Sequence, residues 1–386
     1  MKEQNIYEYV RFATFAKNIS MSILPISQWF DGGVDLPLII AGPCSAESEE
    51  QVLSTARAIA KLGKVNALRA GVWKPRTRPG AFQGVGEPAL AWLAEAKRET
   101  GLPLIIEVAT PQHIEIALKY GVDMFWVGAR TSSNPFSVDE LAIAMSGVEV
   151  PVLIKNPIHP DLELWIGSIE RFEKAGIKKL GAIHRGFSPF QKHAYRNLPK
   201  WEVPIDLKTY IPNLPIICDP SHIAGRPSLI RDVAQKALDL SMDGLMIETH
   251  INPKEALSDA FQQVTPEQLN EILSSLSFRK VQSTNAEFID LLESLREKID
   301  SIDLQLLELL SQRMEIVKRI GEYKFENNVA IVQLRRWEAM IKTRVEMGEC
   351  LGLDERYVKD LLRLVHKESI RKQAEIISPK DKPEKD

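Results

Sequence analysis

Eight short apolar runs recur along the first two thirds of the chain, and a segment with helical periodicity separates most of them. Alternation of this kind is typical of parallel β/α units. Eight units in about 240 residues match a (β/α)₈ barrel in number and size. A doubly wound open sheet is the alternative, and it is less favoured because no GxGxxG motif follows the first run. The predicted strands are residues 38–41, 67–71, 104–108, 124–127, 152–154, 180–183, 216–218 and 245–247.

A helix start marks the end of this pattern. Thr265, Pro266 and Gln268 supply an N-cap, a first-turn proline and a capping-box partner. We therefore predict a barrel domain at 36–276, preceded by an N-terminal extension at 1–35. The polar stretch 277–285 is typical of a linker.

The pattern beyond this linker is helical. Residues 286–327 contain no proline and one glycine, and their apolar residues recur at helix spacing. One helix of that length would span about 60 Å. Further helices predicted at 333–347 and 354–377 complete an all-α domain at 286–377. The tail 378–386 is predicted to be disordered because it combines proline with alternating charges.

Bulk properties narrow the class of protein. A length of 386 residues suits two domains. The net charge of −3 gives no general attraction to nucleic acid or an anionic membrane, so we expect small anionic ligands held by local clusters of Arg and Lys. No apolar run reaches the roughly 18 residues of a membrane helix. The N-terminus lacks a signal-peptide pattern and the 3 cysteines are too few for a disulfide framework, which favours the cytoplasm.

Four side chains that bind metals lie at or after predicted strands. Cys44 follows the first strand, His222 follows the seventh, Glu248 ends the eighth and Asp259 lies in the next loop. In a barrel these positions converge on one mouth. A thiolate, an imidazole and two carboxylates suit Mn, Fe, Co or Zn better than Mg or Ca. Each residue alone is compatible with a structural role, but together they predict one divalent metal site.

Cations gather at the same predicted mouth. Lys and Arg at the end of an apolar strand are poorly explained as a solvated helix face, although surface charge at loop starts is the alternative. Guanidinium groups bind phosphate and carboxylate oxygens in pairs, so the set predicts anionic substrates. Its members are Arg69, Lys74, Arg76, Arg130, Lys155 and Arg185.

The motifs AGPCS, LRAGVWKPRT, FQG, GAR, IKN, HRGF, DPSH and ETH, followed by LSDA, occur in this order over residues 36–275. The set resembles type I-beta 3-deoxy-D-arabino-heptulosonate 7-phosphate (DAHP) synthase. That resemblance implies condensation of phosphoenolpyruvate with erythrose 4-phosphate. Related synthases acting on arabinose 5-phosphate typically carry K-A-N-R where this chain has residues 74–77, which favours erythrose 4-phosphate. Asn156 and Pro157 stand where several type I-beta relatives have Arg-Gly, which keeps the phosphate-binding Lys155 but leaves the shape of the loop after the fifth strand open.

The resemblance also assigns roles to residues. Cys44, His222, Glu248 and Asp259 would hold the metal. The phosphate of phosphoenolpyruvate would bind Arg130, Lys155 and Arg185, its carboxylate would lie near Arg69 and Lys74, and erythrose 4-phosphate would bind Arg76 and Thr77. Lys74 would be the proton donor to the new alkoxide.

Cations also interrupt the apolar face of the long predicted helix. Arg313 and Lys324 are 11 residues apart, about three turns, so they point in nearly the same direction. Ser369 and Gln373 lie four apart on the last helix. Any one of them is compatible with a solvated helix edge, but the set suits electrostatic positioning of a dianion.

The segments LREKIDSID and LLSQRMEIVKRIGEYK, with the late S-x-x-x-Q, resemble the AroQ class of chorismate mutase. The resemblance implies chorismate bound by Arg296, Arg313, Lys324, Arg336, Ser369 and Gln373. It also implies an interlocked homodimer, with Arg296 reaching the partner's site. Residues 333–337 depart from the D-x-x-R-E pattern of that class, because Gln333 and Trp337 replace its acids, which leaves full mutase turnover open.

Three accounts follow from the sequence. The first is a bifunctional enzyme making DAHP and converting chorismate to prephenate. The second is a DAHP synthase whose helical domain only senses a ligand and forms a dimer. The third is a barrel without this activity or with another specificity. Because few residues precede the first strand, feedback control by prephenate or chorismate would be expected to act through the helical domain.

Overall fold

The computed structural model describes residues 21–377 except 31, 35, 75–79, 81, 190, 192 and 279–283. The chain forms two compact units, Met1–Val281 and Gln282–Asp386. Most of the extension predicted at 1–35, part of the predicted linker and the tail predicted at 378–386 lie outside the described residues.

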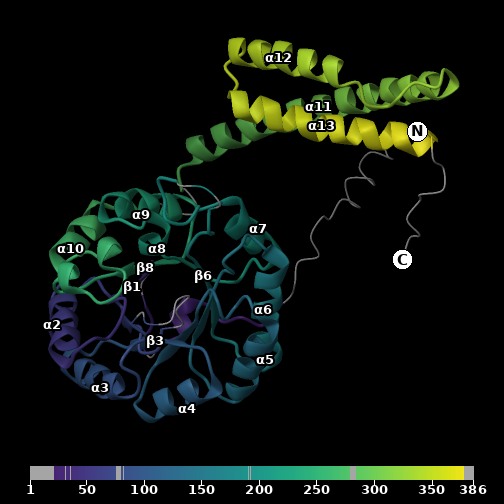
Figure 1. The fold of residues 1–386 in the computed structure, drawn as a ribbon. Coiled ribbons are helices and arrows are strands. Elements are labelled where there is room, and N and C mark those ends of the chain that lie inside the picture. The colour runs from purple at the N-terminus through teal and green to yellow at the C-terminus, as the bar shows by residue number, and fades with distance from the viewer. Residues whose placement is uncertain are drawn as a thin grey trace. The chain divides into compact units, whose positions relative to one another are not determined.

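Eight parallel strands close into a barrel in the order β1 to β8, with β1 paired to β8. Figure 1 shows the helices as an outer ring around these strands. The predicted (β/α)₈ barrel is therefore confirmed, and no predicted strand end is displaced by more than one residue. The strands are β1 (Leu38–Gly42), β2 (Ala67–Ala70), β3 (Leu104–Val108), β4 (Met124–Val127), β5 (Val152–Lys155), β6 (Leu180–His184), β7 (Ile216–Cys218) and β8 (Gly244–Glu248).

Side-chain caps start several helices of the ring. Ser48, Thr110, Asn134 and Asp161 each accept a backbone N–H of the helix that follows. Thr265 and Gln268 form the predicted capping box. The helices are α2 (Glu49–Ala60), α3 (Pro88–Thr100), α4 (Pro111–Lys119), α5 (Pro135–Ala144), α6 (Leu162–Lys174), α7 (Glu202–Tyr210), α8 (Pro220–Ala224), α9 (Ile230–Asp239) and α10 (Pro266–Ser275), with 3₁₀ turns η1 (Ile26–Gln28), η2 (Pro227–Leu229), η3 (Pro253–Glu255) and η4 (Ala260–Gln262).

Two apolar clusters fill the barrel unit. One lies between the strands and the surrounding helices, and the other fills the barrel interior with alternate strand residues such as Leu38, Ile40 and Trp126. Trp29 joins the interior cluster beside Gly181, where an added Cβ would lie 2.9 Å from the indole. Because the interior is packed and Trp29 closes one end of it, a substrate site can form only at the opposite, C-terminal mouth.

The second unit contains three helices, α11 (Ala286–Glu326), α12 (Leu334–Cys350) and α13 (Glu355–Ile377). The predicted all-α domain with one very long helix is confirmed, since α11 has 41 residues. Gly321 allows α11 to approach α13, because a Cβ there would lie 2.8 Å from Ile376 Cδ1. Among the described residues no helix is both long and apolar enough to cross a membrane.

Candidate functional site

Strand order brings the predicted barrel residues to one mouth. Lys155 and Glu248 are the last residues of β5 and β8. Cys44, Lys74, Arg130, Arg185 and Asp259 lie in segments that follow strands, and His222 lies in α8 directly after β7. Since the strands are parallel, all these positions share the C-terminal face of the barrel.

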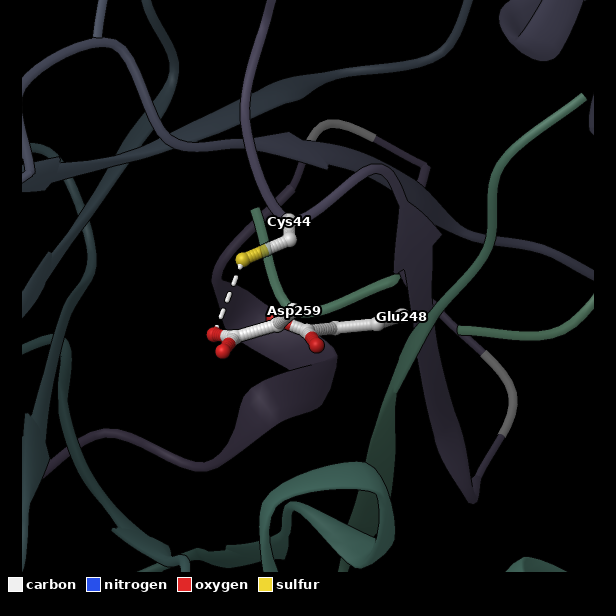
Figure 2. A group of neighbouring side chains, drawn as sticks. All are labelled: Cys44, Glu248 and Asp259. Atoms are coloured by element: carbon white, nitrogen blue, oxygen red, sulfur yellow. Dashed lines mark hydrogen bonds between the residues drawn. The ribbon is translucent and has the colours of Figure 1, made fainter. Parts of the chain in front are cut away.

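Cys44, Glu248 and Asp259 form a compact group of metal-ligand types at this face (Figure 2). One ligand atom from each lies within 4.8 Å of the others. The Cys44 thiol donates to Asp259 Oδ2 at 3.3 Å, the contact drawn dashed in Figure 2. Cys44 and Glu248 are fully buried, while Asp259 adopts a left-handed backbone with φ 48°. A non-glycine residue in that region is often found at a functional site.

His222 lies beside this group. Its Nδ1 is 3.8 Å from Glu248 Oε1 and 2.8 Å from Asp219 Oδ2. The imidazole is thus close to one member of the group, but none of its nitrogens meets all three ligand atoms within the same 4.8 Å. The structure brings three of the four predicted ligands together and leaves the fourth adjacent.

Neighbouring polar groups hold the three ligands in place. Gln262 Nε2 donates to Glu248 Oε2 at 2.5 Å, and Gln263 Oε1 accepts the backbone N–H of Cys44 at 3.0 Å. Arg196 donates to Asp259 Oδ1 at 3.0 Å and to Gln262. The carboxylates are therefore oriented by partners that leave Glu248 Oε1 buried without a hydrogen bond among the described residues.

Burial and charge set the protonation of the group. Burial, followed by the negative charge of Glu248, raises the pKa of the Cys44 thiol to about 12. Burial alone would raise the pKa of Asp259, but Arg196, His222 and Lys74 lower it overall. The pKa of Glu248 is also lowered, because His222 and Arg69 outweigh its burial. The site thus presents two ionised carboxylates beside a protonated thiol that a metal ion would deprotonate.

Three buried or half-buried cations line the mouth. Arg69 lies 3.2 Å from Glu248 Oε1, and both side chains are almost fully buried. Lys155 donates to Asp219 Oδ2 at 2.9 Å, and Lys74 Nζ lies 2.8 Å from Cys44 Sγ. The Trp126 ring lies 5.0 Å from the Arg69 guanidinium carbon and 5.7 Å from Lys155 Nζ, so its π face adds to their stabilisation.

The remaining predicted phosphate ligands differ in how they are held. Arg185 donates to Asn197 Oδ1 at 3.0 Å, and burial lowers its pKa to about 10. Asn156 accepts the Arg185 backbone N–H at 2.7 Å and donates to Gly186 O at 2.9 Å. Arg130 is exposed after β4, while Arg76 and Thr77 lie outside the described residues.

Four of the residues predicted for the helical unit lie on α11 and α13. Arg313 on α11 donates to Ser369 Oγ on α13 at 2.6 Å. Lys324 donates to Ile331 O at 2.6 Å, and burial lowers the pKa of both Arg313 and Lys324. Gln373 is buried, and its Oε1 has no hydrogen-bond partner among the described groups. Arg313, Ser369 and Gln373 therefore lie along the contact of α11 with α13, while Lys324 binds the segment before α12.

Arg296 and Arg336 lie apart from the contact between Arg313 and Ser369. Arg296 is exposed and lies 3.3 Å from Glu293. It is 17 residues from Arg313 on the same helix, which corresponds to about 26 Å. Arg336 is exposed on α12, although its charge contributes to the lowered pKa of Lys324. One chain alone therefore leaves Arg296 distant from Arg313.

Sequence reasoning missed several polar residues that support the site. Asp219, Arg196, Trp126 and Gln262 all contact or face a predicted ligand. Asp219 had a readable signal, since it stands directly before Pro220 at the start of a helix that follows a strand. Arg196 lies in an irregular loop and Gln262 ends the 3₁₀ turn η4, and local pattern gives no such signal for either.

Comparison with known proteins agrees with this geometry. Residues 21–283 match the model of the DAHP synthetase I family, and residues 295–374 match that of chorismate mutase type II. A phospho-2-dehydro-3-deoxyheptonate aldolase of Thermotoga maritima is 34% identical over 62% of this chain and 68% of its own length. A 2-dehydro-3-deoxyphosphooctonate aldolase of Variovorax paradoxus is 27% identical over 69% of this chain and 98% of its own length.

Solved structures give the same result. The crystal structure of the DAHP synthase of Thermotoga maritima has a TM-score of 0.56 at 32% identity, covering 61% of this chain and 67% of that one. A truncated form of the 3-deoxy-D-arabino-heptulosonate 7-phosphate synthase from the same organism has a TM-score of 0.53 at 28% identity, covering 67% and 87%. The chain therefore belongs to the DAHP synthetase I family and, with its chorismate mutase type II domain, is a bifunctional enzyme of the shikimate pathway.

Proposed function

We propose that the barrel condenses phosphoenolpyruvate with erythrose 4-phosphate at a divalent metal, and that the helical unit rearranges chorismate to prephenate. The observation that carries the first activity is the group of Cys44, Glu248 and Asp259 within 4.8 Å, next to the buried Arg69 and Lys155 and the half-buried Lys74. A reaction that joins two phosphoesters requires metal ligands beside groups that bind anions.

The donor set fits a divalent metal. One thiol and two carboxylates converge, Glu248 Oε1 is buried without a hydrogen-bond partner in the described part of the chain, and His222 is adjacent. This mixture of soft and hard donors favours Mn, Fe, Co or Zn. When bound, the metal would supply Lewis-acid polarisation of the aldehyde carbonyl.

The cations of the mouth fit phosphoenolpyruvate. We assign its phosphate to Arg130, Lys155 and Arg185, and its carboxylate to Arg69 and Lys74. The burial of Arg69 and Lys155 supports this assignment, because a cation attracts an anion more strongly where water is excluded.

The condensation then needs a nucleophile, an electrophile and a proton. C3 of phosphoenolpyruvate attacks the aldehyde carbon, water adds at C2, and phosphate leaves by cleavage of its C–O bond. We assign Lys74 as the donor to the new alkoxide, because its Nζ lies 2.8 Å from Cys44 Sγ at the edge of the ligand group.

Erythrose 4-phosphate is the acceptor that we propose, bound by Arg76 and Thr77. The motif at 74–77 favours it, and so does the family match over 21–283. Arabinose 5-phosphate is the competing acceptor, since several relatives are 2-dehydro-3-deoxyphosphooctonate aldolases.

The Arg313–Ser369 contact between α11 and α13 supports the mutase activity. Arg313 and Lys324 would bind the carboxylates and ether oxygen of chorismate, and Ser369, Gln373 and Arg336 would complete the site. Arg296 would act from a partner chain. Exposed apolar residues along α11, such as Leu291, Leu295 and Ile302, support a homodimer because one chain leaves them uncovered.

We also propose that the helical unit exerts feedback control on the barrel. Prephenate or chorismate bound in the helical unit would shift the activity of the barrel. The second account, in which the helical unit only senses this ligand and forms the dimer, predicts the same control without mutase turnover. We place the enzyme in the cytoplasm, since its three cysteines are unpaired.

One experiment tests both activities on the full chain. Metal-stripped protein is assayed with phosphoenolpyruvate and either erythrose 4-phosphate or arabinose 5-phosphate, and then with each candidate metal added back. We expect activity with erythrose 4-phosphate only, restored by metal. The variant Arg313→Ala should lose mutase turnover and keep condensation, while activity without metal or with arabinose 5-phosphate alone would contradict the proposal.

A further inference from the structure

Asp219 is the fully buried residue between β7 and α8. Its Oδ1 accepts the backbone N–H of His222 at 3.0 Å and so caps α8. Its Oδ2 accepts Lys155 Nζ at 2.9 Å and lies 2.8 Å from His222 Nδ1. One carboxylate therefore contacts a proposed phosphate ligand and a proposed metal ligand.

We propose that Asp219 is a positioning residue that joins the metal half of the barrel site to its phosphoenolpyruvate half. This inference rests on the proposed condensation. Asp219 touches neither substrate nor metal in this assignment, and it acts through Lys155 and His222.

The contact with Lys155 fixes the direction of the ammonium group. An ammonium group has three donors, and Asp219 takes one of them. The centroid of the Trp126 ring lies 5.7 Å from Nζ, and the Lys155 side chain is only 6% exposed. The remaining donors are therefore held in one place before a phosphate arrives, so little side-chain entropy is lost on binding.

The contact with His222 fixes the position of the imidazole ring. Asp219 Oδ2 lies 2.8 Å from His222 Nδ1, the nitrogen that also lies 3.8 Å from Glu248 Oε1. A carboxylate behind a metal-binding histidine fixes its tautomer and ring orientation and raises its basicity. The cap to the His222 backbone fixes the start of α8 as well.

The two roles depend on the same oxygen. Lys155 and His222 both meet Oδ2, so the loss of its charge reaches both halves of the site at once. If Asp219 supported only the fold, its replacement would lower stability and leave the affinities for both ligands at their wild-type values.

The test uses the full-length variant Asp219→Asn, which keeps the helix cap because Asn is as good an N-cap as Asp. Asp161→Asn is the matched control, since Asp161 caps α6 in the same way but lies in an exposed position. Manganese affinity and phosphoenolpyruvate affinity are measured by calorimetry, and KM is measured for each substrate. Asp219→Ser, which retains a capping oxygen, is the second variant should Asp219→Asn fail to fold.

We expect Asp219→Asn to weaken manganese binding about tenfold and phosphoenolpyruvate binding about tenfold. The KM for erythrose 4-phosphate should stay within about twofold of wild type, and Asp161→Asn should match wild type throughout. An Asp219→Asn protein that keeps either affinity would overturn the joining role. These binding readouts need no turnover, so a wild-type protein that binds both ligands but forms no product would refute the proposed function and leave this inference measurable.

Discussion

Asn156 offers the sharpest test of how the phosphate side of the barrel is built. Its side chain is fully buried, and it accepts the Arg185 N–H at 2.7 Å while donating to Pro157 O at 2.7 Å and Gly186 O at 2.9 Å. Asn156→Ala removes all three bonds. A buried polar group that loses its partner costs about 1–3 kcal/mol. The Arg185 N–H falls at the upper end of this range, because the carbonyls of Pro157 and Gly186 each retain a second lone pair and the N–H has no alternative. We expect a loss of about 3 kcal/mol.

Calorimetry of the full chain measures this loss. For a domain of this size, about 3 kcal/mol corresponds to a fall in Tm of about 6–12 °C. The barrel transition is identified as the one that phosphoenolpyruvate shifts upward. The exposed Asn252 provides the control, since Asn252→Ala should change stability by less than about 0.5 kcal/mol. An Asn156→Ala barrel that melts within about 2 °C of wild type would refute the reasoning.

Two further outcomes are expected. Gly321→Leu should abolish mutase turnover while condensation persists, because a side chain there would meet Ile376 and Gln373 and separate α11 from α13; paired assays on one preparation check this, and retained turnover would contradict it. Burial lowers the pKa of His184 to about 3, so the unfolded state binds an extra proton below pH of about 6.5 and stability falls by about 1.4 kcal/mol per unit as the pH drops. His184→Phe should remove that part of the slope, as urea unfolding between pH 7 and pH 5 will reveal, and an unchanged slope would count against it.

The barrel and its strand ends could be predicted because the signal is local. Each apolar run had to be buried on both faces, and turn residues bounded it, so β3, β4 and β7 agree with their predicted limits. The position of Glu248 at the end of β8 then followed from counting.

The supporting contacts could not be predicted, because they depend on pairs distant in sequence. Arg196 meets Asp259 across 63 residues, and Lys155 meets Asp219 across 64. Neither pair leaves a periodic trace. The long helix shows the opposite case, since its apolar face was predicted correctly but is largely exposed in one chain. Periodicity indicates that a face is apolar, not which molecule covers it.

The charges of the barrel mouth give a reason for the proposed metal and substrate sites to adjoin. Arg69 pairs with Glu248, and Arg196 pairs with Asp259. A buried charge without a partner costs several kcal/mol, so each carboxylate balances a cation when no ligand is present. A metal held by the two carboxylates would take up part of their negative charge, and an anionic substrate would then offset the cations. This balance is set by contacts of about 3 Å within one opening. The protein's net charge of −3 therefore plays no part in it. In the proposed condensation, metal and phosphoenolpyruvate would therefore act as two halves of one electrostatic arrangement.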